Sequence, residues 1–150
     1  MIMSVLGVVS LVLTGLACGT LFGVALANVP MFVSLPLAEY ADVHQRLDRY
    51  YEPAMPILVF VSLLADIGLA VGADGAARRS AFVLAAVAML GVTLVSQFAN
   101  VPLLKSLRAL DVDNVPADWL DPRLDWRRWH LVRTGLSCAG LICVAAGIAF

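Results

Sequence analysis

The chain has 150 residues, of which 61% are hydrophobic and only 14% are charged, and its formal net charge is −1. Soluble domains draw about a quarter of their residues from the charged types, so this composition excludes an ordinary water-soluble domain. The mean hydropathy of +0.91 agrees, and the lack of a basic stripe argues against nucleic-acid binding. We therefore expect one transmembrane domain over residues 1–150, with the lipid bilayer as its surroundings and no nucleic-acid partner.

Four long apolar runs predict four membrane-spanning helices, because ~20 apolar residues are needed to cross a hydrocarbon core of ~30 Å. The first run lacks the positively charged start of a signal peptide, and we interpret it as a retained helix. The expected fold is an all-α, integral membrane four-helix bundle with helices at about 2–28, 53–73, 79–104 and 127–149.

The first helix carries Gly15, Gly19 and Gly23 at four-residue spacing. Ladders of small residues let helix backbones approach closely in lipid. We favour packing inside one subunit, with a homo-oligomer through the same face as the alternative. Asn28 and Pro30 are expected to end this helix.

The connection between the first and second membrane helices contains an amphipathic stretch. Five of its residues share one face: Leu37, Tyr40, His44, Leu47 and Tyr51. This spacing predicts a short amphipathic helix that lies on the membrane or caps the bundle.

An even number of crossings puts both termini and the turn from Gly75 to Arg79 on one side of the membrane. Lys and Arg number two on that side and seven on the side of the longer connections. The positive-inside rule would place those connections in the cytoplasm, although charges that serve a site leave the orientation open. Asp66 lies in the half of its helix nearer Arg78 and Arg79, and we expect it to snorkel or to pair.

Pro102 in the third helix should kink the chain and free the carbonyl of Phe98. The connection from Lys105 to Arg128 has no apolar period, which predicts an ordered or partly ordered loop. Three cysteines lie inside apolar runs and are expected to behave as small buried hydrophobes rather than as a disulfide framework: Cys18, Cys138 and Cys143.

Polar residues gather near the loop-side ends of the third and fourth helices. Gln97 and Asn100 lie on one face of the third helix, and His130 and Arg133 lie on the fourth. Counting ~1.5 Å per residue from the helix ends puts these side chains at a similar shallow depth. Because polar groups inside a membrane usually mark a pathway or face the bundle interior, we expect them to meet in one pocket.

Neighbouring residues complete the predicted pocket. Asn28 reaches the same depth, and His44 on the amphipathic segment is placed to roof it. Trp126 and Trp129 are by default interpreted as interfacial anchors. The candidates for substrate binding are Trp126, Trp129, Gln97, Asn28 and Tyr40. A metal site would use His44 and His130, but two histidines need further carboxylate, amide or water ligands.

Two motifs carry a family resemblance. They are Asn-Val-Pro-Leu at 100–103 and, after a polar loop, Trp-Arg-Arg-Trp-His-Leu-Val-Arg-Thr at 126–134. Together with the helix layout, they resemble the family of small four-helix membrane proteins that includes the anthrone oxygenases. In that family the first motif commonly continues to a second Asn, where this chain has Leu104, and the position of His130 is often Asn or His.

The resemblance implies a monooxygenase-type oxidation of an electron-rich aromatic or polyketide-like small molecule by molecular oxygen. As a hypothesis, His130 serves as general base or metal ligand, while Arg133 and Asn100 stabilise the enolate or phenolate that forms. Whether copper or iron activates the oxygen, or the substrate reacts with it directly, stays open at this stage. The competing functions are a non-enzymatic membrane subunit that binds or transports a lipid or hydrophobic metabolite, and a haem carrier.

Overall fold

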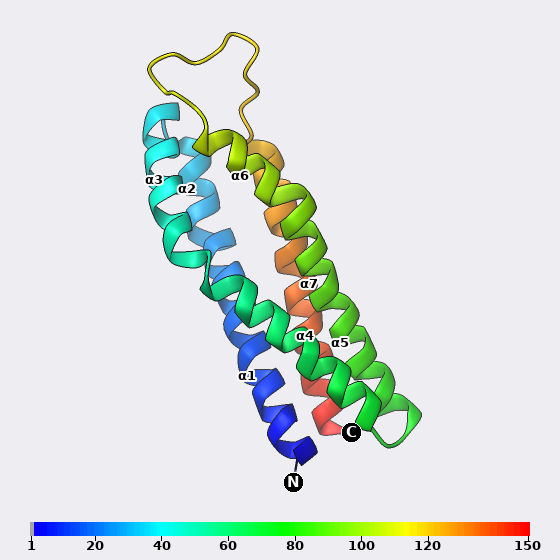
Figure 1. The fold of residues 1–150 in the computed structure, drawn as a ribbon. Coiled ribbons are helices and arrows are strands. Elements are labelled where there is room, and N and C mark those ends of the chain that lie inside the picture. The colour runs from blue at the N-terminus through cyan, green and yellow to red at the C-terminus, as the bar shows by residue number, and fades with distance from the viewer. Residues whose placement is uncertain (1) are drawn as a thin grey trace.

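The computed structural model describes residues 2–150, and every regular element within them is a helix. Four helical rods are long and apolar enough to cross a membrane: Ile2–Ser34, Ala54–Gly72, Ala76–Arg108 and Arg123–Ala149. They pack as a bundle in which the two termini and the turn between the second and third rods share one end (Figure 1). The predicted all-α bundle of four membrane helices is confirmed.

Two of the four rods contain more than one helical segment. The first consists of α1 (Ile2–Gly23), the π-helical turn η1 (Val24–Asn28) and α2 (Val29–Ser34). The third is built in the same way from α5 (Ala76–Val95), the π-helical turn η2 (Ser96–Asn100) and α6 (Val101–Arg108). The remaining helices are α3 (Leu37–Tyr51), α4 (Ala54–Gly72) and α7 (Arg123–Ala149).

The first rod does not end at Asn28 and Pro30, and the prediction that it would was wrong. A proline removes one backbone donor and its ring collides with the carbonyl four residues earlier. Here a π-helical turn absorbs both effects, because the Val29 N–H reaches back five residues to the Val24 carbonyl. The extra residue turns the following side chains by about 100° around the axis and lets the helix continue to Ser34.

The third rod solves the same problem at Pro102. The Val101 N–H donates to the Ser96 carbonyl, and the helix runs on to Arg108 rather than ending near Leu104. The Asn100 side-chain amide donates to the Val95 carbonyl at 3.5 Å. The perturbation predicted for this proline therefore takes the form of a widened turn that ends at an asparagine.

The predicted amphipathic helix is α3, which packs beside α2 and α6 and leads directly into α4 (Figure 1). Its buried residues are Tyr40, Ala41 and His44. They join an aromatic cluster with Phe32 from α2 and Trp126 from α7. This helix therefore closes one side of the bundle at the end that carries the long loop, residues 109–122.

Asp66 corrects another expectation, because it neither snorkels nor pairs with an arginine. Its side chain is fully buried, and the Ser10 hydroxyl donates to Oδ1 at 2.5 Å. The two arginines are engaged elsewhere. Arg79 donates to the Ala73 carbonyl at 2.9 Å, and the Arg78 guanidinium lies over the Phe82 ring.

The glycine ladder of α1 is not used for packing within the subunit at two of its three positions. A Cβ atom placed on Gly19 or Gly23 would meet nothing within 4 Å, whereas one on Gly15 would touch Leu141 at 3.9 Å. Our favoured interpretation therefore fails for Gly19 and Gly23. These positions face outward, toward lipid or a second copy.

Candidate functional site

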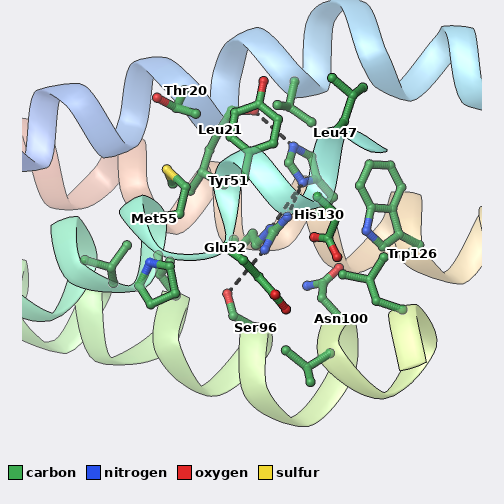
Figure 2. A pocket seen from close by; sticks show the side chains of 18 of the residues that line it. Thr20, Leu21, Leu47, Tyr51, Glu52, Met55, Ser96, Asn100, Trp126 and His130 are labelled. Atoms are coloured by element: carbon green, nitrogen blue, oxygen red, sulfur yellow. Dashed lines mark hydrogen bonds between the residues drawn. The ribbon is translucent and has the colours of Figure 1, made fainter. Parts of the chain in front are cut away.

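A cavity of about 340 Å³ lies between the rods in the half of the bundle that carries the long loop. Its wall is largely apolar, with Leu21, Met55 and Val92 among the lining residues. Polar side chains line the rest, and Figure 2 shows Ser96 and Asn100 of the η2 turn on one side of this space and His130 of α7 on the other. Both π-helical turns contribute, since their last residues, Asn28 and Asn100, line the same cavity.

The structure brings most of the predicted site residues together. Seven of them line the cavity: Asn28, His44, Gln97, Asn100, Trp126, His130 and Arg133. Two do not. Tyr40 is 1% exposed and packs against Phe32 and under the Arg123 guanidinium, and Trp129 is 44% exposed on the outside of α7.

Both ring nitrogens of His130 are occupied. Its Nε2 lies 3.0 Å from the Leu21 carbonyl oxygen, which only accepts hydrogen bonds, so Nε2 carries the proton. Its Nδ1 is then an acceptor, and the Arg133 guanidinium donates to it through Nη2 at 2.8 Å and through Nε at 3.2 Å. His130 therefore holds Arg133 in place and has no lone pair left for a substrate proton or a metal.

Arg133 is a cation without a carboxylate partner. The ion pairs found among residues 2–150 all involve other arginines. Besides His130, its guanidinium reaches the Ser96 hydroxyl at 3.4 Å, and its side chain lines the cavity. A buried guanidinium with no carboxylate at ion-pair distance can bind an anionic or electron-rich oxygen in the cavity, while the charge of Asp48, on the same cavity wall, acts on it from farther away.

Unlike His130, His44 has a ring nitrogen without a hydrogen-bond partner. Its ring is 4% exposed, stacks on Phe32 at 4.5 Å and meets Trp126 edge-on at 4.8 Å, and its Nδ1 has no hydrogen-bond partner. Burial and, to a smaller extent, the positive charges of Arg133 and Arg108 together lower the pKa of His44 from 6.5 to about 4. At neutral pH the imidazole is therefore uncharged and available as a proton acceptor.

Two further buried polar atoms of the cavity wall lack partners. They are Asn100 Oδ1, an acceptor, and Trp126 Nε1, a donor. The Trp126 ring stacks on His130 at 5.1 Å, so its position is set by aromatic packing. Buried polar groups are nearly always paired. These two atoms therefore offer one donor and one acceptor to a molecule in the cavity.

An ionic cluster lies where α3 meets α4. Arg108 at the end of α6 pairs with Asp48 of α3, and it donates to Glu52 at 2.6 Å. Both carboxylates also line the cavity. The cluster ties α6 to the α3–α4 corner and so holds one wall of the cavity.

Several of the lining residues were not singled out from the sequence, among them Phe32, Asp48 and Ser96. Phe32 was missed because the first helix was expected to end at Asn28 and Pro30, and Asp48 was assigned to neither face of the amphipathic segment. Ser96 carried no signal of its own. The repeated Ala-Asn-Val-Pro at 27–30 and 99–102 was the available clue, since it predicts that the two rods share a local structure.

The histidines do not fit a metal centre. His130 has no free nitrogen. Over residues 2–150, no group of three or more His, Cys, Asp or Glu side chains lies close enough together to hold a metal ion. We therefore assign neither His44 nor His130 to a metal.

Comparison with known proteins yields one family. The family model for anthrone oxygenase matches residues 45–143, about two thirds of the chain. The matched region runs from α3 to the last third of α7 and includes Asn100, His130 and Arg133. No curated protein and no solved structure matches the chain.

Proposed function

We propose that this chain, which belongs to the anthrone oxygenase family, oxidises an anthrone-like aromatic ketone with molecular oxygen in the cavity between its helices. The observation that carries the proposal is the pairing of a neutral base, His44, with an arginine that has no carboxylate partner, Arg133, on the wall of one apolar cavity. As in the hypothesis from the sequence, a histidine acts as base and Arg133 stabilises the anion that forms, but the base in our proposal is His44 in place of His130.

The cavity suits a small aromatic molecule. Its volume of about 340 Å³ falls at the lower end of the range of ligand sites, about 300–1,000 Å³. Trp126 and Phe32 supply flat apolar surfaces, and the four rods that form the walls cross the membrane, so an apolar substrate can reach the site from lipid.

An anthrone has a ketone opposite a methylene group, both held between two aromatic rings. Removing one methylene proton leaves an enolate whose negative charge rests on the former ketone oxygen. In our proposal the His44 imidazole takes that proton, and the Arg133 guanidinium faces the oxygen on which the charge develops. Removing either the His44 base or the Arg133 guanidinium should slow the reaction by about 10²–10⁴-fold.

The enolate is electron-rich enough to give an electron to oxygen directly. Recombination of the two radicals forms a hydroperoxide on the former methylene carbon, and loss of water leaves a second ketone. The methylene is thus oxidised to a carbonyl, one oxygen atom enters the product and the other leaves as water. No metal is needed to balance these steps.

The remaining polar groups orient the substrate. Trp126 Nε1 and Asn100 Oδ1, both unpaired, offer one donor and one acceptor to ring hydroxyl and carbonyl groups. His130 acts through Arg133, because its own nitrogens are already bonded. His130→Gln should therefore reduce turnover by disordering Arg133, without removing the base.

The test is oxygen uptake and quinone formation by the purified protein in detergent with 1,8-dihydroxyanthrone, after subtraction of the protein-free oxidation in air. We expect His44→Gln and Arg133→Gln each to lose at least about 10²-fold in kcat. Tyr50→Phe, on the exposed side of the same helix as His44, is the matched control and should keep full activity.

Two outcomes would contradict the proposal. If His44→Gln retains full turnover while His130→Gln abolishes it, the base has been assigned to the wrong histidine. If the anthrone binds, as judged by quenching of tryptophan fluorescence, but no oxygen is consumed above background, the chain is a binding or transport subunit.

A further inference from the structure

Two cysteines far apart in the sequence meet inside the bundle. Cys18 of α1 and Cys138 of α7 have their Sγ atoms 3.4 Å apart. Both are free thiols, and Cys18 is only 7% exposed. The third cysteine, Cys143, is also free and lies on α7 beyond this contact.

α1 and α7 stay packed together from this contact toward the end of the bundle that carries the termini. A Cβ atom on Gly15 would touch Leu141 at 3.9 Å, and one on Gly7 would touch Ile148 at 3.6 Å. A disulfide has an S–S length of about 2.05 Å, so the sulfur atoms, now 3.4 Å apart, would have to approach by roughly 1.3 Å.

We propose that Cys18 and Cys138 are a site of reversible oxidation, where a membrane-soluble organic hydroperoxide forms a disulfide between the first and last helices. Two S–H bonds break and one S–S bond forms. The peroxide O–O bond accepts the two electrons and the two protons, leaving an alcohol and water. This step needs only the thiol pair and the hydroperoxide, and it stands independently of the proposed oxygenation.

The disulfide would lie directly beneath the cavity. Cys18 comes three residues before Leu21, whose carbonyl oxygen lies 3.0 Å from His130 Nε2 and 3.5 Å from Thr134 Oγ1. Cys138 follows Thr134 by one helical turn. A covalent link at this level holds α1 against α7 and restrains the contact that positions His130.

The experiment treats the full chain, purified in neutral detergent, with cumene hydroperoxide and then counts free thiols. Samples are denatured, alkylated with N-ethylmaleimide and weighed by intact-mass spectrometry. We expect alkylation at all three cysteines before treatment and at Cys143 alone afterwards, with full recovery on adding dithiothreitol. Peptide mapping should find Cys18 joined to Cys138 within one chain.

Two variants serve as matched controls. Cys143→Ser should still lose both of its remaining thiols on oxidation, whereas Cys138→Ser should form no disulfide within the chain. A crosslink that depends on Cys143, or oxygen added to single thiols in place of a disulfide, would overturn the proposal. The proposal would also be overturned if all three cysteines of the native protein were still alkylated after treatment with a hydroperoxide dose that oxidises the urea-unfolded chain.

Discussion

Replacing His44 with a residue that does not titrate should change how the stability of the protein depends on pH. The imidazole is 4% exposed and enclosed by Phe32, Tyr40 and Trp126. Burial, with the charges of Arg133 and Arg108, lowers its pKa from 6.5 to about 4. His44→Phe keeps an aromatic ring in this position and removes the proton site.

The sign follows from proton counting. Between pH 6.5 and about 4 the unfolded chain protonates His44 and the folded chain does not, so folding loses stability as the pH falls through this window. Above pH 6.5 the contribution is constant. A shift from 6.5 to about 4, at about 1.4 kcal/mol per pH unit, makes the full effect about 3 kcal/mol.

The measurement is chemical unfolding in neutral detergent, followed by tryptophan fluorescence at several pH values from 7.5 to about 4. The quantity compared is the pH slope of the unfolding free energy in the two proteins, because carboxylates titrating elsewhere contribute equally to both. We expect the wild type to lose about 3 kcal/mol more than His44→Phe over this range. Parallel pH profiles would refute the reasoning, and His44→Gln gives a second comparison if the phenyl ring does not fit.

Two further predictions concern the half of the bundle that carries the termini. Ser10→Ala should lower the unfolding free energy by about 1–3 kcal/mol because it leaves the buried Asp66 carboxyl unpaired, and Ser10→Ala with Asp66→Leu should recover most of that loss in the same unfolding assay. Gly147→Ala should cost about 1–3 kcal/mol, because its Cβ would lie 2.7 Å from the buried Phe82 ring. Gly19→Ala, which meets nothing within 4 Å, should be neutral or stabilising by up to about 1 kcal/mol, and equal melting temperatures for the two alanine variants would contradict the packing described.

The sequence by itself determined the four membrane helices and the amphipathic helix. Apolar runs long enough to cross a bilayer form helices because no water is present to satisfy the backbone otherwise. The spacing of Tyr40 and His44 likewise identified the buried face of α3. Both are local properties, readable from hydropathy and periodicity within one segment.

Only the tertiary structure decided how the rods pass their prolines and which histidine is free. Whether Pro30 ends a helix depends on whether a widened turn is stabilised by the packing that follows, and Phe32 in the aromatic cluster supplies that packing. The sequence favoured His130 as the base and gave His44 the place of a roof or metal ligand. They differ because the Leu21 carbonyl, 109 residues away, occupies one nitrogen of His130, while the aromatic rings around His44 offer its Nδ1 no partner. Hydrogen bonds between distant segments assign chemical roles, and they exist only once the helices have packed.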